Sequence, residues 1–165
     1  MSYETFILLS AVLVAVLLTA GVLGWRSRRR RHRDLVAPQV PDRFEAVLDA
    51  PILYVATTVA GDPYDRVAVH GLGFRARGRV AVGPSGVVLD LPGSAVLLPI
   101  ADLDGVERAT WTIDRVVEPG GLLRIAWRLG ERPLETYLRV TGDDEPVLAA
   151  IRDIQQHPTS SGAAA

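Results

Sequence analysis

The chain has 165 residues and a net charge of −1, with no cysteine and no lysine, so all 18 basic residues are arginines. The absence of cysteine excludes disulfides, zinc–thiolate sites and cysteine nucleophiles. Once an apolar N-terminal segment and the basic run after it are set aside, about 130 residues remain, enough for one domain with a sizeable core.

The first predicted element is a transmembrane helix at residues 6–25, preceded by a short extracytoplasmic segment at residues 1–5. The helix carries no charged residue, and its length of about 30 Å matches the hydrocarbon core of a bilayer. Tyr3 and Trp25 flank it, as interfacial aromatic residues do. A cleaved signal peptide places positive charge before its apolar run, whereas here Glu4 precedes it. The sequence therefore predicts a membrane anchor.

A run of arginines follows the anchor directly. Its members are Arg26, Arg28, Arg29, Arg30, Arg31 and Arg33. Positive charge stays on the cytoplasmic side, so we expect a single-pass protein of the inner (plasma) membrane with its N-terminus outside and its domain in the cytoplasm. Each arginine also attracts anionic headgroups by about 1 kcal/mol. The run is therefore interpreted as a topology signal, and no nucleic-acid partner is expected.

The connector between anchor and domain, a basic collar and linker at residues 26–50, contains two prolines that prevent the membrane helix from continuing. Within it, Asp42 and Glu45 have the spacing of a helix cap and predict a short helix at residues 42–49, ended by Pro51. Beyond the arginine run the chain is acidic, with 12 arginines against 18 acidic residues in residues 34–165.

Residues 51–156 are predicted to form one mainly β domain. Alternating or β-branched segments separated by Gly and Pro turns indicate about seven antiparallel strands. These strands are expected at residues 52–59, 77–82, 87–91, 95–100, 106–117, 122–129 and 134–140.

The period then changes to that of a helix. An acidic, proline-containing start at residues 143–146 is followed by Val147, Leu148, Ile151 and Ile154 on one helical face. We expect this C-terminal helix to cap an open end of the strand meander. Residues 157–165 are predicted to be a disordered tail.

This order resembles the pleckstrin-homology-like (PH-like) superfold, and specifically small bacterial single-span membrane proteins that carry such a domain. The resemblance covers roughly residues 50–156. The motifs that carry it are residues 54–75, Ser-Gly-Val at 85–87, Leu-Pro-Ile at 98–100, Asp-Gly-Val at 104–106 and Gly-Leu-Leu-Arg-Ile-Ala-Trp at 121–127. The resemblance implies a fold and a placement at the membrane, and it implies no reaction.

The long connection at residues 60–74 is the main candidate for a binding surface, because a connection of this length is often functional. In PH-like domains it lies at the open end, where many relatives bind ligands. The candidate binding residues are Asp65, Arg66, His70, Gly71, Gly73 and Arg75. The alternative is structural: Asp65 and Arg66 pair locally, and His70 makes hydrogen bonds within the loop.

A second candidate is an anion site, because Arg75, Arg77 and Arg79 recur at every second residue of a predicted strand. A specific phosphoinositide site is not expected, since no lysine supports these arginines and the surrounding domain is acidic. A single phosphate or anionic headgroup stays open, and so does a purely solvated outer face.

The sequence predicts no enzyme, no cofactor and no metal site, because it lacks a metal-ligand pattern, a nucleophile elbow and a phosphate-binding glycine loop. The leading prediction is a membrane-anchored interaction module that docks a protein partner. One alternative is an anionic lipid or small-anion sensor using Arg66, Arg75 and Arg77. Another is an accessory subunit of a transport or export complex. Small residues four apart on the anchor, such as Ala11 and Ala15, also allow weak homo-association.

Overall fold

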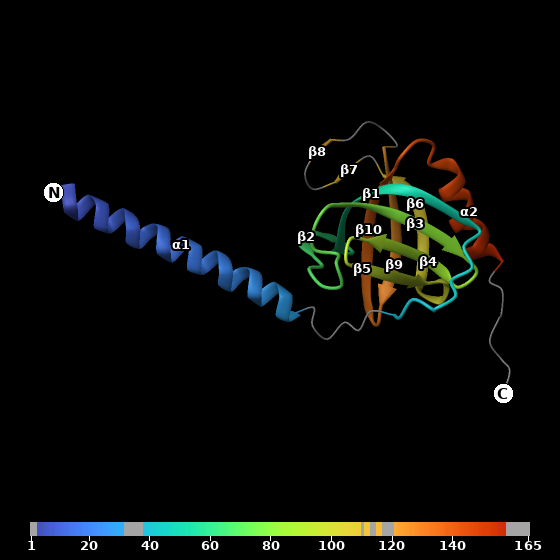
Figure 1. Cartoon of the computed structure of the whole chain (residues 1–165), viewed down its shortest axis with the longest axis horizontal. Helices are drawn as coiled ribbons and strands as arrows, with labels where there is room; N and C mark the ends of the chain where they lie inside the picture. The colour runs from blue at the N-terminus through green and yellow to red at the C-terminus, as the bar shows by residue number, and fades with distance from the viewer. Residues whose placement is uncertain (1–2, 32–37, 110, 113–114, 117–120, 158–165) are drawn as a thin grey trace. The chain divides into compact units, whose positions relative to one another are not determined.

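The computed structural model describes residues 3–31, 38–109, 111–112, 115–116 and 121–157. The chain separates into two compact units, residues 1–34 and residues 35–165. Figure 1 shows the first unit as one helix and the second as a curved sheet with a helix packed against it.

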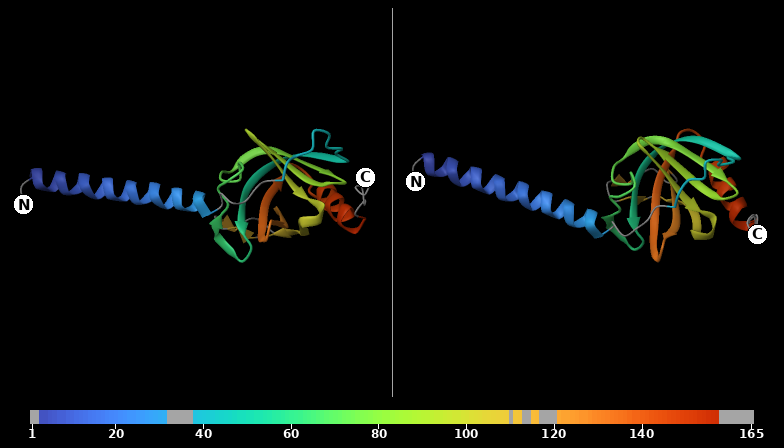
Figure 2. Two further views of the ribbon diagram at one scale, coloured as in Figure 1. Left: turned by 90° about the horizontal axis from the view of Figure 1, so that it is seen from below. Right: turned by 60° about the horizontal axis from the view of Figure 1, so that its bottom comes forward.

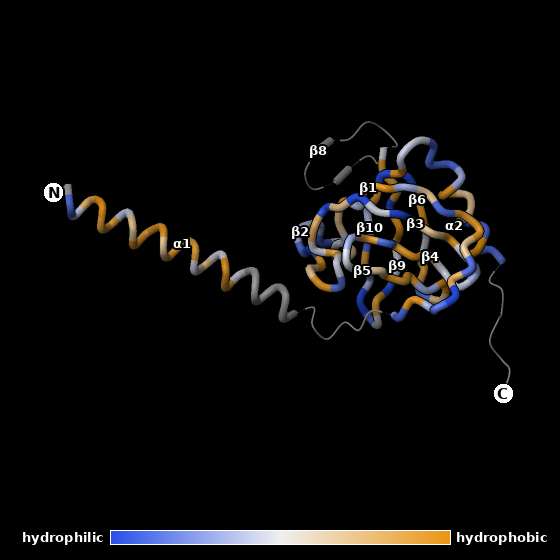
Figure 3. Tube along the Cα trace, viewed as in Figure 1, coloured by the Kyte–Doolittle hydropathy of each residue, from blue (hydrophilic) through white to orange (hydrophobic). Residues whose placement is uncertain are grey.

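Helix α1 (Tyr3–Arg31) is 29 residues long. Its segment Glu4–Gly24 is long and apolar enough to cross a membrane, and Figure 3 shows apolar positions along this whole stretch. Helical backbone continues through the arginines as far as Arg31, whereas Arg33 lies outside the described residues. The predicted candidate span is therefore confirmed as a continuous helix of the required length and composition.

The domain is an antiparallel sheet of eight strands, seven of them in the order β5-β4-β3-β1-β10-β9-β6, with β2 paired to β1 beside this path. The strands of the path are β1 (Leu48–Val59), β3 (Ala76–Gly83), β4 (Gly86–Leu91), β5 (Ser94–Pro99), β6 (Leu103–Ala109), β9 (Leu122–Leu129) and β10 (Arg132–Val140). The added strand is β2 (Asp62–Arg66), and a short 3₁₀ turn, η1 (Ile100–Asp102), joins β5 to β6. A separate two-stranded pair is formed by β7 (Trp111–Thr112) and β8 (Arg115–Val116).

The seven predicted strands are confirmed as the seven strands of the main path, followed by one helix. Two local predictions were wrong. The strand predicted at residues 106–117 is divided, because β6 ends at Ala109. The helix predicted at residues 42–49 does not form, since Val47 N–H bonds to the Val82 carbonyl at 2.8 Å and Leu48 already pairs with Val82 in the sheet. Pairing along β3 satisfies this backbone, and it outweighs the local capping signal.

The core is enclosed by the sheet and by helix α2 (Glu145–Gln156), which lies against one side of it (Figure 2). The predicted apolar face of α2 is confirmed: Val147, Leu148, Ile151 and Ile154 are all buried. Trp127 on β9 is fully buried among the same cluster, as its place on the apolar face of the strand predicts. Helix α2 contacts β6 more than any other strand.

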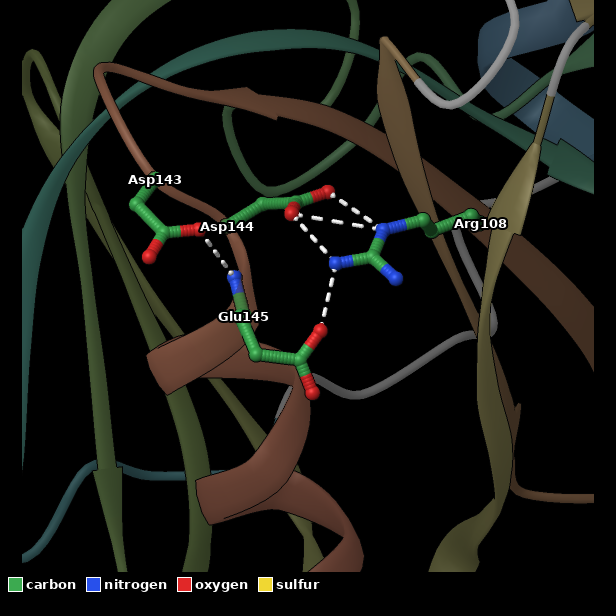
Figure 4. A network of polar contacts seen from close by, with 4 residues as sticks. All are labelled: Arg108, Asp143, Asp144 and Glu145. Carbon is green, nitrogen blue, oxygen red and sulfur yellow. Dashed lines mark hydrogen bonds and ion pairs between the residues drawn. The ribbon is translucent and has the colours of Figure 1, made fainter.

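Arg108 on β6 attaches the start of α2 to the edge of the sheet (Figure 4). Its Nη2 lies 2.7 Å from Asp144 Oδ1 and 2.6 Å from Glu145 Oε2. Asp143 Oδ1 accepts the Glu145 backbone N–H at 3.0 Å, which satisfies one of the free donors of the first turn. Hydrogen bonds from Arg108 lower the pKa of the Asp144 carboxyl, and those to Asp144 and Glu145 raise the pKa of Arg108.

Candidate docking surface

The connection between β1 and β3, which we call the excursion (residues 60–74), is an ordered part of the domain. Its first half turns at Gly61 and returns as β2, which pairs with the end of β1 through Thr58↔Arg66 and Val59↔Asp62. Asp62 Oδ1 accepts the backbone N–H of Tyr64 at 3.0 Å. The predicted long loop is therefore partly a strand.

The second half of the excursion contains a tight turn at residues 69–72. His70 and Gly71 both have positive φ, 55° and 78°, and Leu72 N–H bonds to the Val69 carbonyl at 3.0 Å. Ser94 Oγ donates to the His70 carbonyl at 2.8 Å. A Cβ on Gly71 would lie 2.6 Å from Ser94 Cβ, so this position requires glycine both for its φ and for its close approach to β5.

A buried chain of hydrogen bonds fastens the excursion to the core. Trp127 Nε1 donates to Thr136 Oγ1 at 2.9 Å, and Thr136 Oγ1 lies 2.8 Å from Thr57 Oγ1. The Tyr54 hydroxyl lies 2.9 Å from both Thr57 Oγ1 and the Leu72 carbonyl oxygen. All four side chains are fully buried.

The groups at the two ends of this series of hydrogen bonds determine which hydroxyl donates in each bond. An indole N–H only donates and a carbonyl only accepts, so the single proton of Tyr54 goes to Leu72 and each threonine hydroxyl donates toward Tyr54. Burial raises the pKa of the Tyr54 hydroxyl, which keeps that proton in place. The inner side of the excursion is thus fixed by Leu72, itself 1% exposed, and by this directed chain.

The outer side of the excursion carries two exposed aromatic residues. Tyr64 is 72% exposed and Phe74 is 74% exposed. Apart from α1, the only other exposed large apolar side chain among the described residues is Val47. Large exposed aromatic groups on a fixed scaffold are typical of interaction sites.

The predicted binding residues differ in their position along the excursion and in their exposure to solvent. Asp65 and Arg66 lie on β2 and are half-buried, whereas Arg75 is exposed immediately before β3. His70 and Gly71 form the turn against β5, and Gly73 has no such close contact, since a Cβ there would meet only ordinary neighbours. The binding residues predicted from the sequence did not include Tyr64 and Phe74, because a single aromatic residue in an irregular segment has no periodic pattern that distinguishes a buried ring from an exposed one.

In the described part of the chain, no three His, Asp or Glu residues come together in a group that could hold a metal. Two polar side chains support the backbone of the excursion: Asp62 holds the β2 turn, and Ser94 of β5 holds the turn at residues 69–72. The hydroxyls of Tyr54, Thr57 and Thr136 are engaged with one another or with the backbone, whereas the buried Thr58 Oγ1 beside β2 makes no hydrogen bond to any described residue.

Comparisons with known proteins agree with this architecture. A family model described as bacterial PH domain-like matches residues 35–155. The solution structure of the C-terminal phosphotyrosine interaction domain of mouse APBB2 is similar in fold, with a TM-score of 0.50 and 10% sequence identity over 78% of this chain and 99% of that chain. A search of curated proteins finds no match. The family and the fold predicted from the sequence are confirmed.

Proposed function

The chain belongs to the bacterial PH domain-like family, and we propose that it is a membrane-anchored interaction module that docks a protein partner through the excursion. The observation that carries this proposal is the exposure of Tyr64 and Phe74 on a segment whose inner side is fixed. Large aromatic side chains contribute most to protein interfaces. A segment that is already ordered loses little conformational entropy on binding, so this surface is suited to a partner that buries both rings.

The placement at the membrane is part of the same proposal. α1 would hold the domain at the inner membrane with its N-terminus outside, because six arginines follow the apolar span. The acidic domain would then be repelled by anionic lipid, which favours a protein surface over the bilayer as the contact of the excursion. An accessory role in a transport or export complex differs only in the identity of that partner.

The test uses the full chain in its native membranes. A photo-crosslinking residue in place of Tyr64 should capture a defined protein partner, and the additional substitution Phe74→Ser should reduce that capture at least several-fold. Val47→Ser is the matched control, because it removes an equally exposed apolar side chain outside the excursion. Equal capture by the Phe74→Ser and Val47→Ser variants, or crosslinks between copies of the chain alone, would reject docking through the excursion.

The second prediction, an anion sensor using Arg66, Arg75 and Arg77, is not favoured as a single three-arginine site. Arg66 lies opposite Thr58 and Arg77 opposite Leu53 on β1. Five residues of strand separate these positions by about 17 Å, so the two side chains start too far apart to hold one small anion. An anion site that includes Arg77 needs a different second residue.

A further inference from the structure

A groove on the outer face of the sheet joins three strands that are distant in sequence. It has a volume of about 470 Å³ and is lined by residues of β1, β3 and β10 and by the turn that follows β10. Leu53 lies at its centre, directly opposite Arg77 on one side and Arg139 on the other. Cross-strand partners share a face of the sheet, so both arginines stand beside Leu53 on the solvent side.

We propose that this groove binds a phosphate monoester dianion between Arg77 and Arg139. The two Cα atoms are separated by about 10 Å, two strand spacings, which two arginine side chains can bridge around one small anion. Each guanidinium presents a planar set of donors that matches phosphate oxygens. Two positive charges balance the two negative charges of a monoester.

The charges around the groove support this assignment. None of the residues that line it is acidic. Arg79, two residues further along β3, is neutralised by Asp49 at 2.9 Å, whereas no ion pair joins Arg77 or Arg139 to a carboxylate within the described part of the chain. The domain has more acidic than basic residues, yet these two arginines lie beside the same leucine without a carboxylate partner among the described residues. The fold does not require that arrangement.

The floor and rim of the groove complete a concave site. Ile52 and Val140 line the groove from the strands beneath it, with their side chains buried in the core on the other face of the sheet, and Thr141 and Gly142 lie at one end, where Thr141 N–H bonds to the Pro51 carbonyl at 2.9 Å. The excursion meets β1 at Val59, about 20 Å along the strand from Leu53. Phe74, at the other end of the excursion, precedes Arg77 by three residues, but no residue of the excursion lines the groove. The proposal therefore does not depend on partner docking.

The experiment uses the full chain in phosphatidylcholine nanodiscs. Because the chain has no cysteine, Thr141→Cys allows a single environment-sensitive dye to be attached at the rim of the groove. The Thr141 side chain is exposed and only its backbone N–H is used in the fold. One arm adds inorganic phosphate, with chloride at equal ionic strength as control. The other replaces part of the lipid with phosphatidic acid, with phosphatidylglycerol as control.

A dye response to inorganic phosphate would identify a soluble phosphate as the ligand, and a response confined to phosphatidic acid would identify a lipid headgroup. In either case Arg77→Gln and Arg139→Gln should each weaken the response about tenfold. Arg132→Gln should leave it unchanged, since Arg132 is an exposed arginine outside the groove. No response in either arm, or a response that survives both groove substitutions, would overturn the proposal.

Discussion

The two sides of the excursion differ in what they contact. The inner side is held by a buried leucine and by a directed chain of hydrogen bonds from Trp127 to the Leu72 carbonyl. The outer side carries Tyr64 and Phe74, which are mostly in solvent. A flexible loop would have neither a fixed inner side nor a fixed pair of exposed rings, because its apolar side chains would pack against one another in changing arrangements. The difference indicates that the fold holds Tyr64 and Phe74 on an ordered segment although neither ring is needed to fill the core.

Truncating Leu72, which fixes the inner side of the excursion, should have the largest effect on the stability of the domain. Leu72→Ala deletes a fully buried side chain and should lower the free energy of unfolding of the domain by about 2–5 kcal/mol. Denaturant unfolding of the full chain, followed by the fluorescence of its three tryptophans, of which Trp127 is buried in the core, measures this loss. A change below about 1 kcal/mol would mean that the excursion is packed more loosely than its burial indicates.

The turn at Gly71 should be the next most sensitive position. Gly71→Ala forces a Cβ against Ser94 at a positive φ, and we expect a loss of about 1–3 kcal/mol. Gly61→Ala is the matched control, because Gly61 has a similar φ of 80° with no atom within 4 Å of the added Cβ. The difference between the two variants in the same unfolding assay isolates the contact with Ser94. Equal losses would show that only the backbone conformation matters.

Alkaline pH should weaken the domain without any substitution, through Tyr54 on the inner side of the excursion and through Tyr137, which packs against a second buried cluster. Burial raises the pKa of Tyr54, and burial together with the hydrogen bond to Glu135 raises that of Tyr137 to about 12. Both hydroxyls hold their protons more tightly in the folded state than at the ordinary value near 10. The stabilisation is therefore complete below pH 10 and is lost as pH rises from there toward about 12.

The chain suits this measurement because it has no lysine to titrate in the same range, and arginine stays protonated there. The unfolding midpoint should fall between pH 10 and pH 12, and Tyr137→Phe should make that fall shallower. A midpoint independent of pH over this interval would contradict the assigned burial of the two hydroxyls.

Changes on the outer side should have the smallest effect on stability. Tyr64→Ser and Phe74→Ser replace exposed side chains, so each should alter the free energy of unfolding by no more than about 0.5 kcal/mol. The partner-capture experiment should be sensitive to the same substitutions. If either variant unfolds the domain, its ring belongs to the inner side, and the distinction between the two sides fails at that residue.

Much of the fold was predictable because its signals are periodic and local. The apolar span before the arginines, the alternation at residues 122–129 and 134–140, and the helical face of α2 each depend on neighbours in the sequence. The helix expected at residues 42–49 had an equally local signal, yet pairing with β3 outweighed it. Local signals fail where a distant strand offers the backbone better partners.

The sequence by itself determined the candidate membrane span, the succession of the main strands along the chain and the family, since these depend on composition, period and motif. Only the tertiary structure decided which face each side chain occupies. It buried Leu72 while exposing Phe74 two residues away, and it brought Arg77 and Arg139 to either side of Leu53. The physical reason is that exposure and cross-strand proximity depend on register between segments far apart in the chain, and no local pattern encodes that register completely.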